Sequence, residues 1–328
     1  MPANSIRPFP HRFLLIITGL AAVLTFVIIL LSAYIRLAES GLGCSPWPEC
    51  YAHFSSDPQM QSPLGQLQGD HFGVRLMHRV TASVIALLVL MIVAIGFRYR
   101  DADGAGIRLP VAILIVTVLL TLLGINTPTR ELPLIAFGNL VGGYVLLALL
   151  FWLGLRLMHE KTTAIGVGSV TAAPSRLALL AVSLQIASGG WASANYSTAA
   201  CSGILHCNQV DSSQLISGFN PLRQLPIAEG ILLDGSASSI MLVHQVAAVF
   251  LSLVVTVCLV PMLRQATELR TNLLVILFLL IATFSLGGMG TVLEMPLWSG
   301  MLHNLLSILF LLATGRLTYL IHAGLRPL

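Results

Sequence analysis

The chain has 328 residues, of which 56% are apolar and only 9% are charged, and its formal net charge is +4. Soluble domains carry about 25% charged residues, so this composition excludes a water-soluble protein. Apolar stretches of about 20 residues, the length that crosses a bilayer as a helix, recur along the chain. We place eight of them at 13–35, 73–97, 107–126, 133–157, 175–194, 238–263, 272–291 and 297–320. The expected fold is an all-α integral membrane protein with eight transmembrane helices.

The distribution of Lys and Arg between the loops predicts how these helices are oriented. One set of loops and termini carries twelve of these residues, and the opposite set carries five, namely Arg36, Arg75, Arg79, Arg130 and Arg223. Because cytoplasmic loops are enriched in basic residues, both termini are expected to be cytoplasmic. The two long loops, 36–72 and 195–237, are then expected to face outward. The positive charge belongs to the inner face of a membrane protein and does not indicate a nucleic-acid partner.

Four of the five cysteines lie in the two long loops, as Cys44 with Cys50 and Cys201 with Cys207, each pair separated by five residues. Outward-facing loops lie in an oxidising compartment, where paired cysteines usually form disulfides. We therefore expect one disulfide in each loop. Cys258 lies inside the sixth helix and is expected to be a small, buried apolar residue.

The chain contains two halves with the same order of features. The first and fifth helices each precede a pair of cysteines, and the second and sixth open with the related segments "LMHRV" and "LVHQV". The fourth and eighth are introduced by "ELPLIAFGNL" and "LEMPLWSGMLHNL". This pattern predicts two four-helix repeats, roughly 1–165 and 166–328. Because four is even, both halves start on the same side, so they are expected to be parallel repeats related by an axis along the membrane normal.

Three histidines fall at one depth within this register. His78, His244 and His303 each lie about six residues after the expected outer start of a helix, which is roughly 9 Å into the membrane. Asn139 holds the matching position of the fourth helix, although aligning "FGNL" with "LHNL" would place Gly138 there instead. Strongly polar side chains inside a bilayer seldom face lipid, so we expect these residues to face the interior of the bundle.

Two imidazoles that face each other across a helix bundle are suited to the axial coordination of a haem iron, and we assign this role to His244 and His303. Zinc or copper could use the same ligands, although these helices carry no further cluster with metal-ligand spacing. A third interpretation is that the histidines only form hydrogen bonds between helices, in a transporter or a structural subunit. Small residues beside these positions would let helices or a flat macrocycle approach closely: Gly142, Gly143, Gly287, Gly288 and Gly300.

The segment "RLAESGLGCSPWPEC" at 36–50 resembles the first outer loop of the haem A synthase family of cytochrome-oxidase assembly proteins. The "HR" at 78–79, the "GGWASANY" at 189–196 with the cysteine pair that follows it, and the later two histidines are similar to the same family. The resemblance covers essentially the whole chain. It implies an oxidoreductase of the bacterial inner membrane that works with haem O synthase and the assembly machinery of a terminal oxidase.

The resemblance further implies two haem sites. The C-terminal half would bind haem b, with its iron between His244 and His303. The N-terminal half would hold the substrate, haem O, on ligands from the second and fourth helices. The C8 methyl of haem O would be oxidised there to a formyl group, which gives haem A. The outer-loop disulfide of the N-terminal half would stabilise this site or take part in the chemistry.

Two residues depart from the family pattern, and both lie in the substrate half. Asn139 stands where the family has the second substrate-haem histidine, and Arg75 stands where it has a catalytic glutamate three residues before His78. Asparagine is a poor haem ligand, so His78 would bind alone and leave a sixth position open. The guanidinium of Arg75 would pair with an anionic propionate, and Asp70 or Glu131 could replace the missing carboxylate.

These departures leave a second function open. The chain could be a haem b-binding membrane protein for electron transfer or oxidase assembly that makes no formyl group. The electron acceptor and the oligomeric state, including a homo-oligomer, also stay open. Residues 208–237 form a long polar stretch that we expect to lie over the outer mouth of the C-terminal half.

Overall fold

The computed structural model describes residues 9–39, 72–98, 107–126, 132–158, 171–207, 210, 212–225, 235–265, 269–293 and 297–323. Within these residues, eight segments are long and apolar enough to cross a membrane. Their helices are α1 (Phe9–Glu39), α5 (Phe72–Arg98), α6 (Arg108–Asn126), α7 (Pro133–Met158), α8 (Ala172–Ala194), α10 (Gly235–Leu259), α12 (Arg270–Val292) and α13 (Leu297–Ala323). The predicted eight-helix, multi-pass membrane protein is confirmed.

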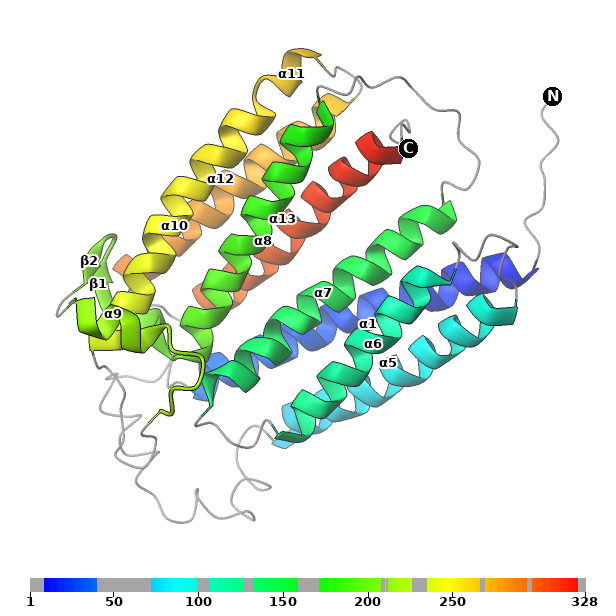
Figure 1. The fold of residues 1–328 in the computed structure, drawn as a ribbon, viewed down its shortest axis with the longest axis horizontal. Helices are drawn as coiled ribbons and strands as arrows, with labels where there is room; N and C mark the ends of the chain where they lie inside the picture. The colour runs from blue at the N-terminus through cyan, green and yellow to red at the C-terminus, as the bar shows by residue number, and fades with distance from the viewer. Residues whose placement is uncertain are drawn as a thin grey trace.

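The long helices form two groups with matching neighbour relations (Figure 1). In the N-terminal group, α1 and α6 each pack against both α5 and α7. In the C-terminal group, α8 and α12 each pack against both α10 and α13. The groups meet where α1 and α7 contact α13, and where α7 contacts α8. These contacts are those expected of two repeats, but the boundary near residue 165 lies outside the described residues, so the division into two repeats stays a prediction.

The segment between α8 and α10 contains short elements that the all-α prediction did not include. They are the 3₁₀ helix η2 (Ser197–Ala199), the antiparallel strands β1 (Cys201–Gly203) and β2 (His206–Cys207), and helix α9 (Ser212–Gly218). We call the end of the bundle that carries them the hairpin end. Helix α1 begins and α13 ends at the opposite end (Figure 1). The described helices therefore agree with termini on one side, whereas the orientation of that side stays a prediction.

Helix α10 differs at both ends from the predicted span of 238–263. It begins at Gly235 because its first turn is held by the preceding segment: the hydroxyls of Ser236 and Ser217 lie 2.8 Å apart. It ends at Leu259, and Pro261 separates it from the short helix α11 (Met262–Gln265). Proline lacks an amide hydrogen and clashes with the preceding helical turn, which explains the break.

The apolar side chains divide between the interior and the outer surface. Two buried clusters form the core: one lies within the N-terminal group around Ile92 and Leu150, and the other, around Leu273 and Ile308, also includes Leu147 of α7 and so joins the two groups. Other large apolar side chains point outward. Contiguous exposed apolar surface is unfavourable in water but matches the hydrocarbon of a bilayer, so it marks the lipid-facing surface of the bundle.

Candidate functional site

A cavity opens within the C-terminal group toward the hairpin end. Side chains of α8, α10, α12 and α13 form most of its wall, which is mainly apolar. The N-terminal group closes one side with Leu37 of α1 and with Leu140 and Tyr144 of α7. His244 and His303 both line this cavity. The structure therefore brings these two histidines to a single enclosed space.

Helix α8 holds the imidazole of His244 along one edge. The Nδ1 atom lies 2.8 Å from the hydroxyl of Ser188 and 3.1 Å from the amide nitrogen of Gln185. A Cβ atom added to Gly189 would lie 3.0 Å from Cε1 of the same ring. Because such a distance is too short for an ordinary side chain, glycine is what lets α8 approach the ring this closely. All described side-chain hydrogen bonds of His244 use Nδ1, which leaves Nε2 for a ligand.

Helix α12 approaches His303 in a related way. A Cβ atom added to Gly287 would lie 3.0 Å from Cε1 of His303. Thr283, one turn before this glycine, lies with its backbone beside the ring. Gln185 stands one turn before Gly189 in the same manner, so each histidine faces a polar residue and a glycine on a neighbouring helix. The difference is that Nδ1 of His303 makes no hydrogen bond of ordinary geometry with the described residues.

This arrangement distinguishes between the metal ions and cofactors that two histidines could bind. In the described part of the chain, no three His, Cys, Asp or Glu residues gather as a metal site. A structural zinc ion needs about four protein ligands, so two imidazoles in an apolar cavity do not fit it. They do fit a porphyrin iron, which takes four ligands from its own macrocycle and two from the protein.

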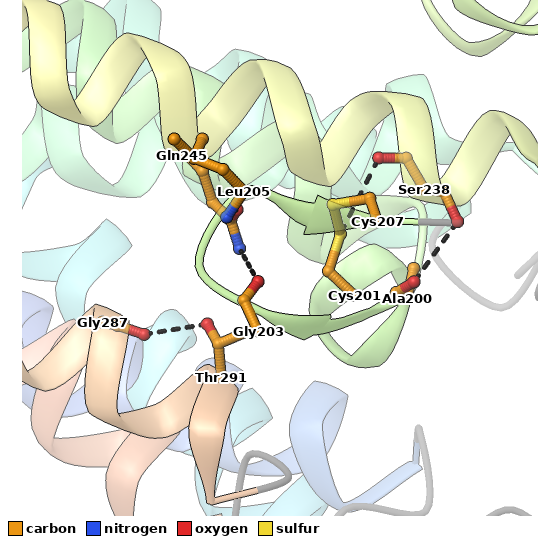
Figure 2. The surroundings of a disulfide bond; sticks show 9 residues. All are labelled: Ala200, Cys201, Gly203, Leu205, Cys207, Ser238, Gln245, Gly287 and Thr291. Carbon is orange, nitrogen blue, oxygen red and sulfur yellow. Dashed lines mark hydrogen bonds between the residues drawn. A yellow bond between two sulfur atoms is a disulfide. The ribbon is translucent and has the colours of Figure 1, made fainter. Parts of the chain in front are cut away.

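The hairpin β1–β2 reaches this cavity through Ile204, and Gln245 of α10 holds the hairpin in place (Figure 2). The side-chain oxygen of Gln245 accepts a hydrogen bond from the amide of Leu205 at 2.6 Å, and its nitrogen donates to the carbonyl of Gly203 at 3.4 Å. Ile204, between them, lines the cavity. The structure pairs Cys201 with Cys207 as a disulfide at the base of the hairpin.

The hairpin, rather than residues 208–237, thus contributes the described part of the cover, since no residue of α9 lines the cavity. Helix α9 instead packs against the start of α10, and Gly218 at its end accepts a hydrogen bond at 3.0 Å from the indole nitrogen of Trp191. The predicted pair Cys44 and Cys50 lies outside the described residues.

Replacing Gln245 by alanine is expected to loosen this cover. A lost hydrogen bond contributes about 1.4 kcal/mol, so the Leu205 amide should exchange with solvent about tenfold faster. Hydrogen exchange followed by mass spectrometry of the purified protein would measure it. Thr256→Ala is the matched control, because its hydroxyl bonds only the Ser252 carbonyl of the same helix, at 2.8 Å. Unchanged exchange in the Gln245 variant would mean that the disulfide alone fixes the hairpin.

The substrate-half residues lie apart from this cavity. His78 on α5 and Asn139 on α7 each stand seven residues, or two helical turns, before a member of one buried cluster, Ile85 and Leu146 respectively. Because residues seven apart share a helix face, both predicted positions lie on stripes that lead into the interior of the N-terminal group. Arg75, one turn before His78, is half-buried. None of these residues lines the cavity of the C-terminal group.

The position of Gly138 helps to decide between the two alignments of the fourth helix. A Cβ atom there would lie 3.1 Å from Leu123 of α6, so this residue packs directly against a neighbouring helix. Asn139 rather than Gly138 therefore occupies the stripe that continues to Leu146. Asp70 and Glu131, the predicted replacement carboxylates, lie outside the described residues.

Three residues at or beside the cavity were not assigned to a site from the sequence. Gln185 and Ser188 are polar residues in an apolar span, a signal that would have identified them as interior-facing. Arg36, in the last turn of α1, donates a hydrogen bond from Nε to the hydroxyl of Ser193 on α8 at 2.6 Å. This bond joins the two helix groups at the rim of the cavity, which Ser193 lines.

The chain matches known proteins along most of its length. A family model described as cytochrome oxidase assembly protein matches residues 15–314. The heme A synthase of Shewanella oneidensis (strain MR-1) is 32% identical over 311 residues, which cover 90% of this chain and 93% of that protein. The family match begins within α1 and ends within α13, so it includes residues of all eight long helices. The chain therefore belongs to the haem A synthase family of cytochrome oxidase assembly proteins.

Proposed function

We propose that this protein is a haem A synthase, which oxidises the C8 methyl of haem O to a formyl group and uses haem b as its resident cofactor. The observation that carries the proposal is the pair His244 and His303, which line one apolar cavity, each held by a glycine of a neighbouring helix. Membership of the family makes a role in haem A biosynthesis the expected one.

The residues of the cavity would each have a distinct role toward haem b. His244 and His303 would offer their Nε2 atoms as axial ligands, and the apolar wall would exclude water. Arg36 carries its positive charge beside the rim, where it would neutralise an acidic propionate. Haem b, when bound, supplies one-electron transfer.

The N-terminal group would hold the substrate. His78 would ligate haem O from α5, and Asn139 would face it from α7 as a polar residue that is a poor ligand. Arg75 would pair with a propionate of the substrate or position it. The proposed substrate site thus consists of Arg75, His78 and Asn139. Because only His78 would ligate the iron of haem O, the opposite side of that iron would stay accessible.

The membrane orientation follows from the loop charges. The hairpin end would face the outside of a bacterial inner membrane and both termini the cytoplasm. There, the Cys201–Cys207 pair would be oxidised, as would Cys44–Cys50. Haem O synthase and the assembly machinery of the terminal oxidase are the proposed partners, because one supplies the substrate and the other receives the product.

The test is to extract and identify the haems of membranes in which this chain is produced together with haem O synthase. Haem A in the extract, absent when this chain is omitted, is the expected result. Haem O alone, with haem b still bound to the purified protein, would overturn the synthase proposal. That outcome would favour the second candidate, a haem b electron-transfer or assembly protein, which the Arg75 and Asn139 departures motivate. A colourless protein that stays colourless when haem is supplied would exclude both.

The glycine beside His303 gives a steric test of the cofactor site. In Gly287→Ala, the new methyl would lie 3.0 Å from the imidazole and displace the ring, so we expect about tenfold weaker haem retention. The measurement is haem content after extended washing in detergent. Gly315→Ala on α13 is the control, because an added Cβ meets nothing within 4 Å there. Equal haem retention in both variants would show that the ring does not have to stay where α12 holds it.

A further inference from the structure

The hydroxyl of Ser188 lies between two partners that together constrain its proton. It is 3.0 Å from the carbonyl oxygen of Gln185 on its own helix, and 2.8 Å from Nδ1 of His244 on α10. A carbonyl oxygen can only accept, and a serine hydroxyl has a single hydrogen to donate. When that hydrogen goes to Gln185, the hydroxyl oxygen can only accept from His244. Nδ1 of His244 then carries the proton, and Nε2 has a free lone pair.

This tautomer is the one that a metal ligand needs. An imidazole that binds iron through Nε2 must keep its proton on Nδ1, and the partner of that proton fixes the orientation of the ring. We infer that Ser188 is a positioning residue: it accepts the Nδ1 proton of His244 and thereby sets the strength of this histidine as the ligand on the α8 side. The inference rests on the proposed function, because it assumes that His244 binds the iron of haem b.

Gln185 can reinforce the same arrangement. Its side-chain oxygen is buried and has no hydrogen-bond partner among the described residues, while its nitrogen lies 3.1 Å from Nδ1 of His244. A half-turn of the planar amide exchanges these two atoms, which are nearly equal in size. The oxygen would then be a second acceptor for the Nδ1 proton, and its buried lone pairs would no longer be unsatisfied. The turn would also give up the hydrogen bond that this nitrogen donates to the backbone carbonyl of His244 at 3.3 Å, so Ser188 is the acceptor on which the inference depends.

The two histidines differ in this respect. His303 has no side-chain acceptor at Nδ1 in the described part of the chain, whereas His244 has one at 2.8 Å. Donation of the Nδ1 proton to an acceptor places more electron density on Nε2, which strengthens the bond to ferric iron most. Ser188, as the side-chain acceptor of this proton, would therefore lower the reduction potential of the haem, whereas the ring of His303 has only the backbone of Thr283 beside it.

The experiment compares four forms of the full chain loaded with haem: the unaltered protein, Ser188→Ala, Ser188→Thr and Ser183→Ala. Threonine keeps a hydroxyl at the position. Ser183 lies on the same helix, but among the described residues its hydroxyl bonds only the carbonyl of Leu179, at 2.8 Å. The measurements are the midpoint potential of the haem, its rate of release, and the melting temperature of the haem-free protein.

We expect Ser188→Ala to release haem 10- to 100-fold faster, the usual effect of losing a partner of a ligating histidine. Its potential should rise, by about 59 mV for each tenfold loss of affinity that is specific to ferric iron. Threonine should restore both properties, and Ser183→Ala should leave them unchanged. If Ser188→Ala loses haem altogether while the haem-free protein melts at the same temperature, the inference is likewise supported.

Three results would overturn it. A haem-loaded Ser188→Ala protein with the original potential would remove the inference and leave the proposed function standing. A parallel fall in haem retention and in the melting temperature of the haem-free protein would show that Ser188 only stabilises the fold. Failure of the unaltered chain to bind haem would remove the proposed function, and the inference with it.

Discussion

Replacing either His244 or His303 by alanine is expected to abolish the low-spin spectrum of a b-type haem in the purified protein. Both histidines line one cavity, and six-coordinate low-spin iron needs an imidazole on each side of the macrocycle. Loss of a ligating residue should weaken haem binding by about 100-fold or more, beyond the effect of losing its hydrogen-bond partner. Absorbance spectra of the oxidised and reduced protein, with haem quantified per chain, measure this directly.

Each variant keeps one of the two imidazoles, so any haem that it retains should be five-coordinate. His78→Ala is the control, because His78 lies on α5 and does not line the cavity. If His78→Ala removed the low-spin signal and the cavity variants kept it, the assignment of cofactor and substrate to the two halves would be reversed.

The parts of this fold that the sequence predicts are those that depend on local composition. Eight apolar stretches predict eight spans because each must satisfy its backbone hydrogen bonds within itself in lipid. The common depth of His244 and His303 stays a prediction: His303 lies six residues after the start of α13, but His244 lies nine after the start of α10, which begins earlier than expected. The start of α10 at Gly235 was missed, because the serine in its first turn is held by Ser217 of helix α9, 19 residues earlier.

The cavity itself could not be predicted in this way. Its polar contacts join residues far apart in the chain: Ser188 and His244 are 56 positions apart, and Leu205 and Gln245 are 40. Such pairs depend on which helix faces which, and the sequence of one helix does not contain that information. The hairpin was missed for a related reason, since its strands have three and two residues and are too short to show an alternating pattern.

Asn139→His is expected to create a second bis-histidine haem site, in the N-terminal group. Asn139 and His78 lie on helix stripes that lead into the same buried cluster, so an imidazole at 139 would approach the face opposite His78. With haem O supplied, the unaltered chain should hold one haem b and only part of a second equivalent of haem O. The variant should hold about two haems per chain and retain haem O about tenfold longer. Extracted-haem analysis and a second low-spin signal in the spectrum are the measurements.

Two controls separate ligation from a general effect of the substitution. Asn139→Gln keeps an amide of greater length and should not produce the second low-spin signal. Gly138→His places the imidazole at the other alignment, where even a Cβ atom would meet Leu123 at 3.1 Å, so it should destabilise the protein without adding a ligand. A second low-spin haem in Gly138→His, and none in Asn139→His, would show that the fourth helix presents position 138 to the substrate.

Arg75→Glu tests whether the substrate half lacks a carboxylate or has replaced its function. A correctly placed general acid or base contributes about 100-fold or more to a reaction rate, so restoring the carboxylate beside His78 should increase haem A formation if the arginine merely occupies its position. Combined with Asn139→His, the gain should exceed that of either single variant, because one change adds binding and the other adds proton transfer. A loss of haem A in both single variants would mean that Arg75 and Asn139 are themselves needed for the reaction. The guanidinium and the amide would then be working parts of a site built around one histidine, with the open face of the iron as the place where the oxidation occurs.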